Sequence, residues 1–335
     1  MTTKNQRKIV VTSTPLRISF VGGGTDFQKF YTQHGGSFIS ATIDKEIIVT
    51  VKRHSSIFEE KYRINYSSSE ITNELKDIRN DIARECIKLT GTKPPIFIST
   101  IGDLPEKSGL GSSSSFCVGL LNALFELNNK SISREDLVKA AIEVEINSLG
   151  KPIGIQDHYA ATYGGLNFFK VSTSGEVSVE PIALNEMEIK KILFNNFLLF
   201  WTKIQRDSSD ILSDQNQNIQ ENIPELLFMK NQCPVFWNTI NNNFELKEIG
   251  TLIKKGWEKK MNLSSKITNK KITSWYEKAI DNGALGGKLL GAGGGGFLLI
   301  ISDKKSKNQI KKALFDLPEI KVNYNPNGSR VLLVE

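Results

Sequence analysis

A glycine- and serine-rich segment, Leu104 to Ser115, stands between a strand-like stretch and a helix with an apolar stripe. Glycines allow unusual backbone angles, and the free amide N–H groups at a helix start point toward a bound anion. The helix dipole adds about 0.3–1 kcal/mol in favour of negative charge. A flexible linker seldom stands so tightly between two regular elements, so the pattern favours a phosphate site over a simple connection.

Two acidic residues downstream could act on a phosphate or a metal. On a predicted helix over about 134–149, Glu145 lies on the apolar stripe, whereas Glu143 lies on the polar side. The stripe consists of Leu137, Ala141, Val144 and Ser148. An inward carboxylate needs a cation or hydrogen-bond donors to offset its desolvation. Periodicity alone therefore predicts either a metal ligand or an internal salt bridge at Glu145.

The second acid, Asp157, lies in a short segment that runs from Gly154 to Tyr159 after Pro152. Alone, such a position is typical of an aspartate in a turn. Its neighbour His158 is interpreted as a packing or hydrogen-bonding residue, because the other two histidines supply no metal-ligand spacing.

Two further glycine-rich segments could lie against a ligand. The first, Thr14 to Asp26, places Arg17 in a strand and three glycines at its end; a tight turn with a surface ion pair is an equal alternative. The second, Gly291 to Gly296, matches the dinucleotide string by spelling alone. It precedes a strand instead of following the first one, so a dinucleotide fold is excluded. A P-loop is excluded as well, because neither Gly287-Lys288 nor Gly150-Lys151 is followed by Ser or Thr.

The elements that position these segments alternate between strand and helix patterns. A boundary is predicted near residue 190, although no linker composition marks it. The predicted strands are 9–21 with an interruption at Thr14-Pro15, 38–51 as one strand or a pair, 96–101, 166–171, 197–201, 297–302 and 330–334. The predicted helices are 26–34, 78–89, one from 116 to 127, 134–149, several in 208–280, and 304–315.

Together, these segments resemble the three motifs of the GHMP small-molecule kinases, the superfamily of galactokinase, homoserine kinase, mevalonate kinase and phosphomevalonate kinase. The similarity spans nearly the whole chain. Pro105 to Ser115 resembles the phosphate loop P-x-x-x-G-L-G-S-S, and Gly291 to Gly296 resembles the third motif, which supports that loop and the substrate. Glu145 falls at the position of the magnesium-binding glutamate, and Asp157 at that of the catalytic aspartate of members that have one.

This resemblance implies an α+β fold with two domains, 1–190 like ribosomal protein S5 domain 2 and 191–335 ferredoxin-like, with ATP and substrate between them. Asp157 is the expected acid–base residue, with Arg17 beside it, and Mg²⁺ is expected on Ser113 and Glu145. The residues expected to bind ATP are Pro105, Gly109, Leu110, Gly111, Ser112, Ser113, Ser114 and Ser115. Those expected to bind the substrate are Arg17, Gly23, Gly24, Asp26, Asp157, Tyr163, Arg206, Gly293 and Gly294.

The first motif departs from galactokinase, which has Glu-His where this chain has Gly23-Gly24. The residues of this motif are instead similar to those of the branch of the family that phosphorylates the anomeric hydroxyl of D-glycero-D-manno-heptose 7-phosphate. The product of that branch, the 1,7-bisphosphate, leads to nucleotide-activated heptose. Two alternatives are another sugar 1-kinase and a non-catalytic, sugar-sensing relative. The 7-phosphate ligand is left open among Lys151, Arg206 and Lys288, with Arg206 preferred.

Composition and charge limit the function classes further. The 335 residues are 39% hydrophobic and 24% charged, which excludes disordered and fibrous classes. Three cysteines without metal or redox spacing, and no leader or long apolar stretch, predict a cytoplasmic protein outside the membrane. Residues 247–335 hold 17 Lys/Arg against 8 Asp/Glu. These charges could attract anionic ligands, either phosphates or nucleic acid, or could belong to solvated helix faces, as at Lys254, Lys255, Lys259 and Lys260. Solvated faces are preferred, because no ladder of aromatic residues is interleaved with the charges. A small-molecule partner and no nucleic acid are expected, with a dimer left open.

Overall fold

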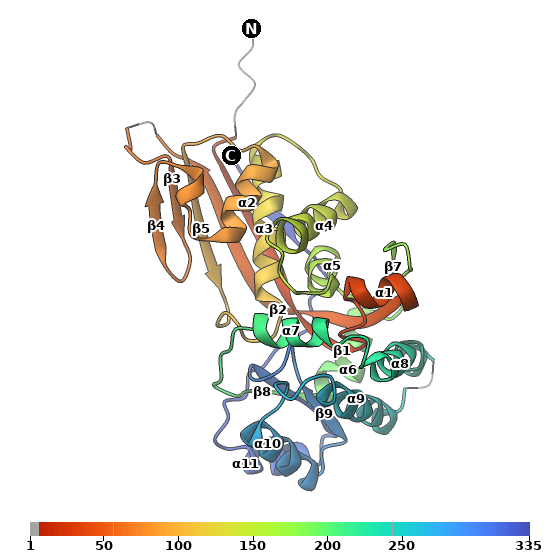
Figure 1. The fold of residues 1–335 in the computed structure, drawn as a ribbon. Helices are drawn as coiled ribbons and strands as arrows, with labels where there is room; N and C mark the ends of the chain where they lie inside the picture. The colour runs from red at the N-terminus through yellow and green to blue at the C-terminus, as the bar shows by residue number, and fades with distance from the viewer. Residues whose placement is uncertain (1–6, 56, 243) are drawn as a thin grey trace.

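Two separate sheets, each covered by helices, organise the chain (Figure 1). The computed structural model describes residues 7–55, 57–242 and 244–335. One sheet has eight strands and the other has three. Mixed helices and strands confirm the α+β class that the sequence predicts.

The larger sheet is built around one long antiparallel pair. Strand β1 (Ile9–Val21) runs beside β2 (Gly36–Arg53), and helix α1 (Gln28–His34) connects them. The two ends of β2 pair with different strands, one with β5 (Ile96–Gly102) and the other with β6 (Leu166–Val171). The other strands are β3 (Tyr62–Asn65), β4 (Ser69–Thr72), β7 (Val177–Pro181) and β11 (Arg330–Val334). The three glycines of the first glycine-rich segment directly follow the end of β1, where the chain leaves the sheet.

Helix α3 (Ser112–Leu127) packs on β1 and β2 and is covered in turn by other helices (Figure 1). Its apolar residues are buried almost all round, as expected for a helix between a sheet and a helical layer. The covering helices are α2 (Asp81–Thr90), α4 (Arg134–Ile142) and α5 (Gln156–Tyr163). Packing on all sides fixes α3, and with it the Gly/Ser loop at its first turn.

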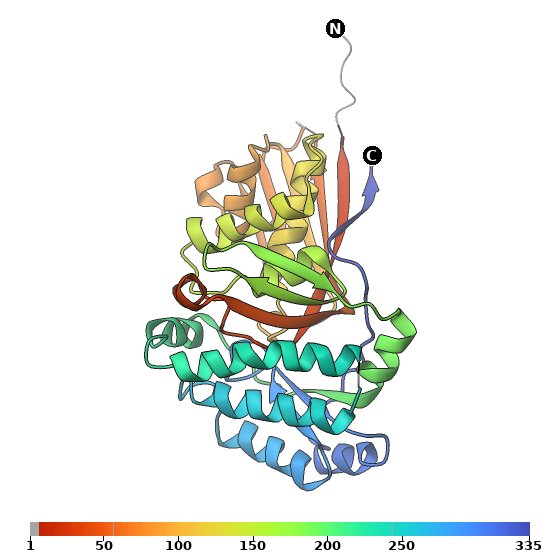
Figure 2. The ribbon, with the colours of Figure 1, turned by 90° about the vertical axis from the view of Figure 1, so that its right-hand side faces the viewer.

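The smaller sheet has the antiparallel order β8-β10-β9. Its strands are β8 (Phe197–Trp201), β9 (Gly286–Leu289) and β10 (Phe297–Ile301), and every residue of the central β10 is buried. Its helices are α7 (Ser209–Gln217), α8 (Ile223–Asn241), α9 (Leu246–Met261), α10 (Lys270–Asp281) and α11 (Lys307–Ala313). Helix α8 packs on both β1 and β2 of the first sheet and on α9 of the second part, so it joins the two (Figure 2). No helix in the described ranges is long and apolar enough to cross a membrane.

The end of the chain returns to the first sheet. Strand β11 pairs antiparallel with β1 at the sheet edge, far from the strands that precede it in sequence. The boundary predicted at residue 190 lies inside helix α6 (Glu186–Ile192) and stays a prediction.

Several elements differ from the sequence-based expectations. β1 is continuous through Pro15, where its register with β2 shifts, and β2 is one long strand. The predicted helix 134–149 changes at Glu143 into a π-helical segment, Glu143–Ser148, so that Ser148 is exposed instead of buried. The short strands β3, β4, β7 and β9 are not predicted from the sequence, because they lack the continuous apolar runs that mark the similarly short β8 and β10.

Candidate active site

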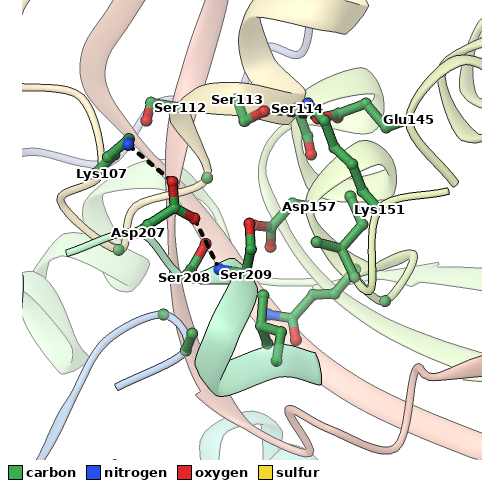
Figure 3. A pocket seen from close by; sticks show the side chains of 18 of the residues that line it. Lys107, Ser112, Ser113, Ser114, Glu145, Lys151, Asp157, Asp207, Ser208 and Ser209 are labelled. Carbon is green, nitrogen blue, oxygen red and sulfur yellow. Dashed lines mark hydrogen bonds and ion pairs between the residues drawn. The ribbon is translucent and has the colours of Figure 1, made fainter. Parts of the chain in front are cut away.

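A cleft of about 600 Å³ lies where the first glycine-rich segment, the Gly/Ser loop and the 291–295 loop meet (Figure 3). Each of these segments follows or precedes a strand or a buried helix, so rigid elements position all of them. The three motifs, which are distant in sequence, therefore form one site.

The Gly/Ser loop presents the first turn of α3 to the cleft. Gly111, with a φ of 81°, precedes the helix, and Ser112, Ser113 and Ser114 line the cleft. The amides at a helix start have no intrahelical partner and are free to bind an anion. The loop is held from behind, because the Leu110 carbonyl accepts from the Arg17 amide at 3.0 Å. This arrangement is suited to bind a phosphate group, and we call it the phosphate cradle.

The third glycine-rich segment packs directly against this cradle. A Cβ added to Gly109 would lie 2.6 Å from the carbonyl oxygen of Leu290, and one added to Gly291 would lie 2.5 Å from Cα of Gly109. Both glycines also have positive φ, 83° and 74°. Side chains are therefore excluded at this crossing, and the two backbones support one another.

Arg17 and Asp157 form an ion pair beside the cradle. The Arg17 Nε and one terminal nitrogen each donate to a carboxylate oxygen of Asp157 at 2.8 Å, and the other terminal nitrogen donates to the Gly109 carbonyl at 2.8 Å. Arg17 is 5% exposed, whereas the Asp157 side chain is 30% exposed. The guanidinium thus fixes Asp157 in the cleft and ties it to the phosphate loop.

Asp26 is a second carboxylate in the cleft and is held by backbone amides. Gly24 and Gln156 donate to its two oxygens at 2.9 and 3.0 Å. Burial raises the pKa of Asp26, and the nearby Asp157 raises it further, although the amide hydrogen bonds oppose the shift. Gly23 and Gly24 line the same wall.

Glu145 is fully buried and lies at the centre of a hydrogen-bonded network. Ser113 Oγ donates to its Oε1 at 2.6 Å, and Lys151 Nζ lies 3.2 Å from the same oxygen. His158 Nε2 is 2.9 Å from Oε2. Burial raises the pKa of the Glu145 carboxyl, but the hydrogen bond with His158 and the charges of His158 and Lys151 lower it to about 2. The internal salt bridge, one of the two predicted alternatives, is therefore present.

Comparisons with known proteins place these motifs in one family. The model of the GHMP kinases N-terminal domain matches residues 76–165, and that of the GHMP kinases C-terminal domain matches residues 242–318. The D-glycero-alpha-D-manno-heptose 7-phosphate kinase of Campylobacter jejuni is 32% identical over 317 residues, 92% of this chain and 93% of the relative. The chain belongs to the GHMP kinases.

Other relatives of this GHMP kinase agree with that assignment. The galactokinase of Pyrococcus furiosus is 24% identical over 92% of each chain. The crystal structure of a D-glycero-D-manno-heptose 1-phosphate kinase from Bacteroides thetaiotaomicron has a TM-score of 0.80 at 22% identity and covers 97% of this chain and 99% of that one. The two-domain GHMP kinase fold is thereby confirmed, and the protein is an ATP-dependent phosphotransferase.

The oxygens of Ser113 and Glu145 suit the Mg²⁺ that kinases employ. Mg²⁺ prefers oxygen ligands and completes its shell with substrate phosphates and water, so one carboxylate and one hydroxyl suffice. Within the described residues, no group of three or more His, Cys, Asp or Glu side chains could hold a metal. Ser113 and Glu145 would hold the ion, which would supply neutralisation of charge on the nucleotide phosphates.

Some predicted site residues lie outside the cleft lining. Pro105, Leu110, Ser115 and Gly294 do not line it, and Ser115 Oγ instead donates to the Pro15 carbonyl at 2.9 Å. Tyr163 stacks on Tyr159 with ring centroids 5.9 Å apart and also lies away from the cleft. Arg206 and Gly293 do line it, and Arg206 is exposed at the rim. The roles of all these residues stay predictions.

Lys260 is a cleft residue that the sequence analysis assigned to a solvated face. In the structure it is 7% exposed and lines the cleft, so that interpretation is wrong at this position. Ile249, Ile253, Trp257 and Lys260 recur every three or four residues along α9, and all are buried. This helical spacing was the signal that could have placed Lys260 inside.

Gly154 tests the role of Asp26, because a Cβ at Gly154 would overlap the carboxylate of Asp26. We expect Gly154→Ala to displace that carboxylate and to raise the KM for the acceptor at least about tenfold, roughly the 1.4 kcal/mol of one lost hydrogen bond. The KM for ATP should change little. An acceptor KM equal to that of the parent enzyme would contradict a binding role for Asp26. Asp26→Asn is the companion variant, and the two effects should not add, because both act on the same carboxylate.

Proposed function

We propose that this GHMP kinase transfers the γ-phosphoryl group of ATP to the anomeric hydroxyl of D-glycero-D-manno-heptose 7-phosphate. The product is the 1,7-bisphosphate, a precursor for nucleotide-activated heptose. The observation that carries the proposal is the Arg17–Asp157 pair, a cleft-facing carboxylate tied to the phosphate cradle. The heptose 7-phosphate is supported by the relative from Campylobacter jejuni, whose name states that substrate.

In the proposed reaction, Asp157 accepts the proton of the anomeric hydroxyl while the hydroxyl oxygen attacks the γ-phosphorus. The bond from this phosphorus to the bridging oxygen breaks, and its electron pair leaves with ADP. Arg17 is close enough to offset charge on the moving group and to hold Asp157 in place. Phosphoryl transfer depends mainly on such positioning and charge stabilisation.

The wall of the cleft that Asp26, Gly23 and Gly24 form is here called the acceptor wall, and it is suited to a hydroxylated molecule. The Asp26 carboxylate, its amide donors and the backbone of Gly23 and Gly24 all lie there. Carboxylate oxygens accept hydrogen bonds from sugar hydroxyls, and glycine backbone allows a ring to approach closely. Because both Glu145 and Asp157 line the cleft, a catalytic enzyme is favoured over a non-catalytic sugar sensor.

A panel of acceptors tests the substrate. We expect kcat/KM for heptose 7-phosphate to exceed that for unphosphorylated heptose or galactose by about 100-fold or more, because a cationic site made for a phosphate is left unpaired by a neutral sugar. ADP release with ATP and magnesium is the measurement. Equal kcat/KM for the phosphorylated and plain sugars would point to a general sugar 1-kinase instead.

A further inference from the structure

Two lysines from different elements are buried in the wall of the cleft. Lys260 lies near the end of α9, and Lys288 lies in β9. They are 7% and 5% exposed, yet both line the cleft. A lysine ammonium is rarely buried without a counter-ion, because desolvation of the charge is costly.

Among the described residues, neither lysine has a carboxylate partner. The Lys260 ammonium donates to the carbonyl of Gly291, and that of Lys288 donates to the carbonyl of Phe20 at 3.0 Å. The nearby carboxylates are already engaged, Asp157 by Arg17 and Asp26 by backbone amides. The wall thus holds excess positive charge.

The electrostatics of the two lysines reflect this excess. Burial and, to a smaller extent, the charge of Arg17 lower the pKa of Lys260 to about 8, although Asp26 and Asp157 oppose that shift. Burial also lowers the pKa of Lys288, and the charges of Lys260 and Arg17 add to the effect. A bound dianion would relieve this repulsion and hold both lysines protonated.

The geometry puts the pair near the proposed acceptor, because Lys288 donates to the carbonyl of Phe20, three residues before Gly23, and both lysines line the cleft together with Asp26 and Asp157. Lys260 responds to Arg17, Asp26 and Asp157, which surround the proposed acceptor. Lys151, by contrast, is 3.2 Å from Glu145 and belongs to the ATP side. Arg206 is exposed at the rim. A buried lysine pair without a carboxylate partner attracts a phosphate more strongly than an exposed arginine does, because the dielectric constant around buried charges is lower.

We propose that Lys260 and Lys288 together form an anion subsite that binds the phosphate group of the acceptor. The ligand class is a phosphate monoester on a hydroxylated carbon chain. This inference rests on the proposed function for the identity of the acceptor. The existence of the site and its preference for an anion do not depend on that function.

The test uses Lys260→Met and Lys288→Met in the full-length enzyme, with Lys255→Met, an exposed residue of the same helix, as the control. Methionine keeps the length of the chain and removes the charge, and melting temperatures check that each variant folds. We expect kcat/KM for heptose 7-phosphate to fall about 100-fold in both variants. The values for unphosphorylated heptose should fall less than about threefold, and the KM for ATP should stay within about twofold.

Binding is measured separately by calorimetric titration of inorganic phosphate and heptose 7-phosphate, with ADP and magnesium filling the donor site. Loss of phosphate affinity in both variants, but not in Lys255→Met, supports the subsite even if heptose 7-phosphate proves not to be the acceptor. That second failure would appear in the parent enzyme, as equal turnover of phosphorylated and plain sugars. Unchanged affinity in the variants, or equal losses of turnover for phosphorylated and plain sugars, would overturn the subsite.

Discussion

Asp157→Asn is expected to lower kcat by about 10²–10⁴-fold, because asparagine keeps the shape of the side chain but cannot accept the proton of the acceptor hydroxyl. The KM for ATP should change little, since the phosphates are predicted to bind to the cradle formed by the first turn of α3. Asparagine keeps one oxygen to accept from Arg17, so the guanidinium should stay in place. Steady-state rates at saturating ATP and acceptor measure the effect.

The control for this variant is Asp281→Asn, an exposed aspartate at the end of α10 that does not line the cleft. It should leave kcat unchanged. If Asp157→Asn kept most of its kcat, the base assignment would be wrong. Catalysis would then depend on Arg17, the metal and the alignment of the reactants, because positioning alone supplies much of the rate in phosphoryl transfer.

The glycine motifs were the part of the site most open to prediction from sequence. Where two backbones cross closely, a side chain would clash, so glycine is required there. Gly109 and Gly291 lie at such a crossing. The order of the three motifs indicates the family, and the fold was predicted from that family resemblance. Periodicity alone supplied the compatible elements, such as the strand that carries Arg17, without fixing how the strands pair.

Long-range contacts decided what the sequence left open. The segment Glu143–Ser148 is π-helical, and a pattern with a period of 3.6 residues does not predict this winding. Ser148 is therefore exposed, while Glu145 stays buried. That Glu145 forms an internal salt bridge could not be predicted without the fold, because its partners Lys151 and His158 lie on a later loop and helix. Lys260 shows the same limit, because a lysine among other lysines looks solvated until its helix face is known.

Glu145→Gln is expected to have the second large effect, on the dependence of the rate on magnesium. The variant removes a full negative charge from the predicted metal site while keeping the side-chain shape. Since charge stabilisation by a bound ion contributes several kcal/mol to phosphoryl transfer, kcat should fall about 10²-fold or more, and half-maximal rate should need at least about tenfold more Mg²⁺. Rates measured across a magnesium series give both values.

The network around Glu145 sets the cost of this substitution in stability and supplies its control. Glutamine offers one acceptor oxygen where Ser113, Lys151 and His158 now share two, so one donor loses its partner. The free energy of unfolding should therefore fall by about 1–3 kcal/mol in urea titrations, with the variant still folded. Glu143→Gln, two residues earlier and bonded only to Asn147 and Ser148 at the surface, should change neither quantity. A Glu145→Gln enzyme that was less stable but kept the parent's magnesium dependence would restrict Glu145 to a structural role, because the lost hydrogen bond and the lost metal ligand affect separate measurements.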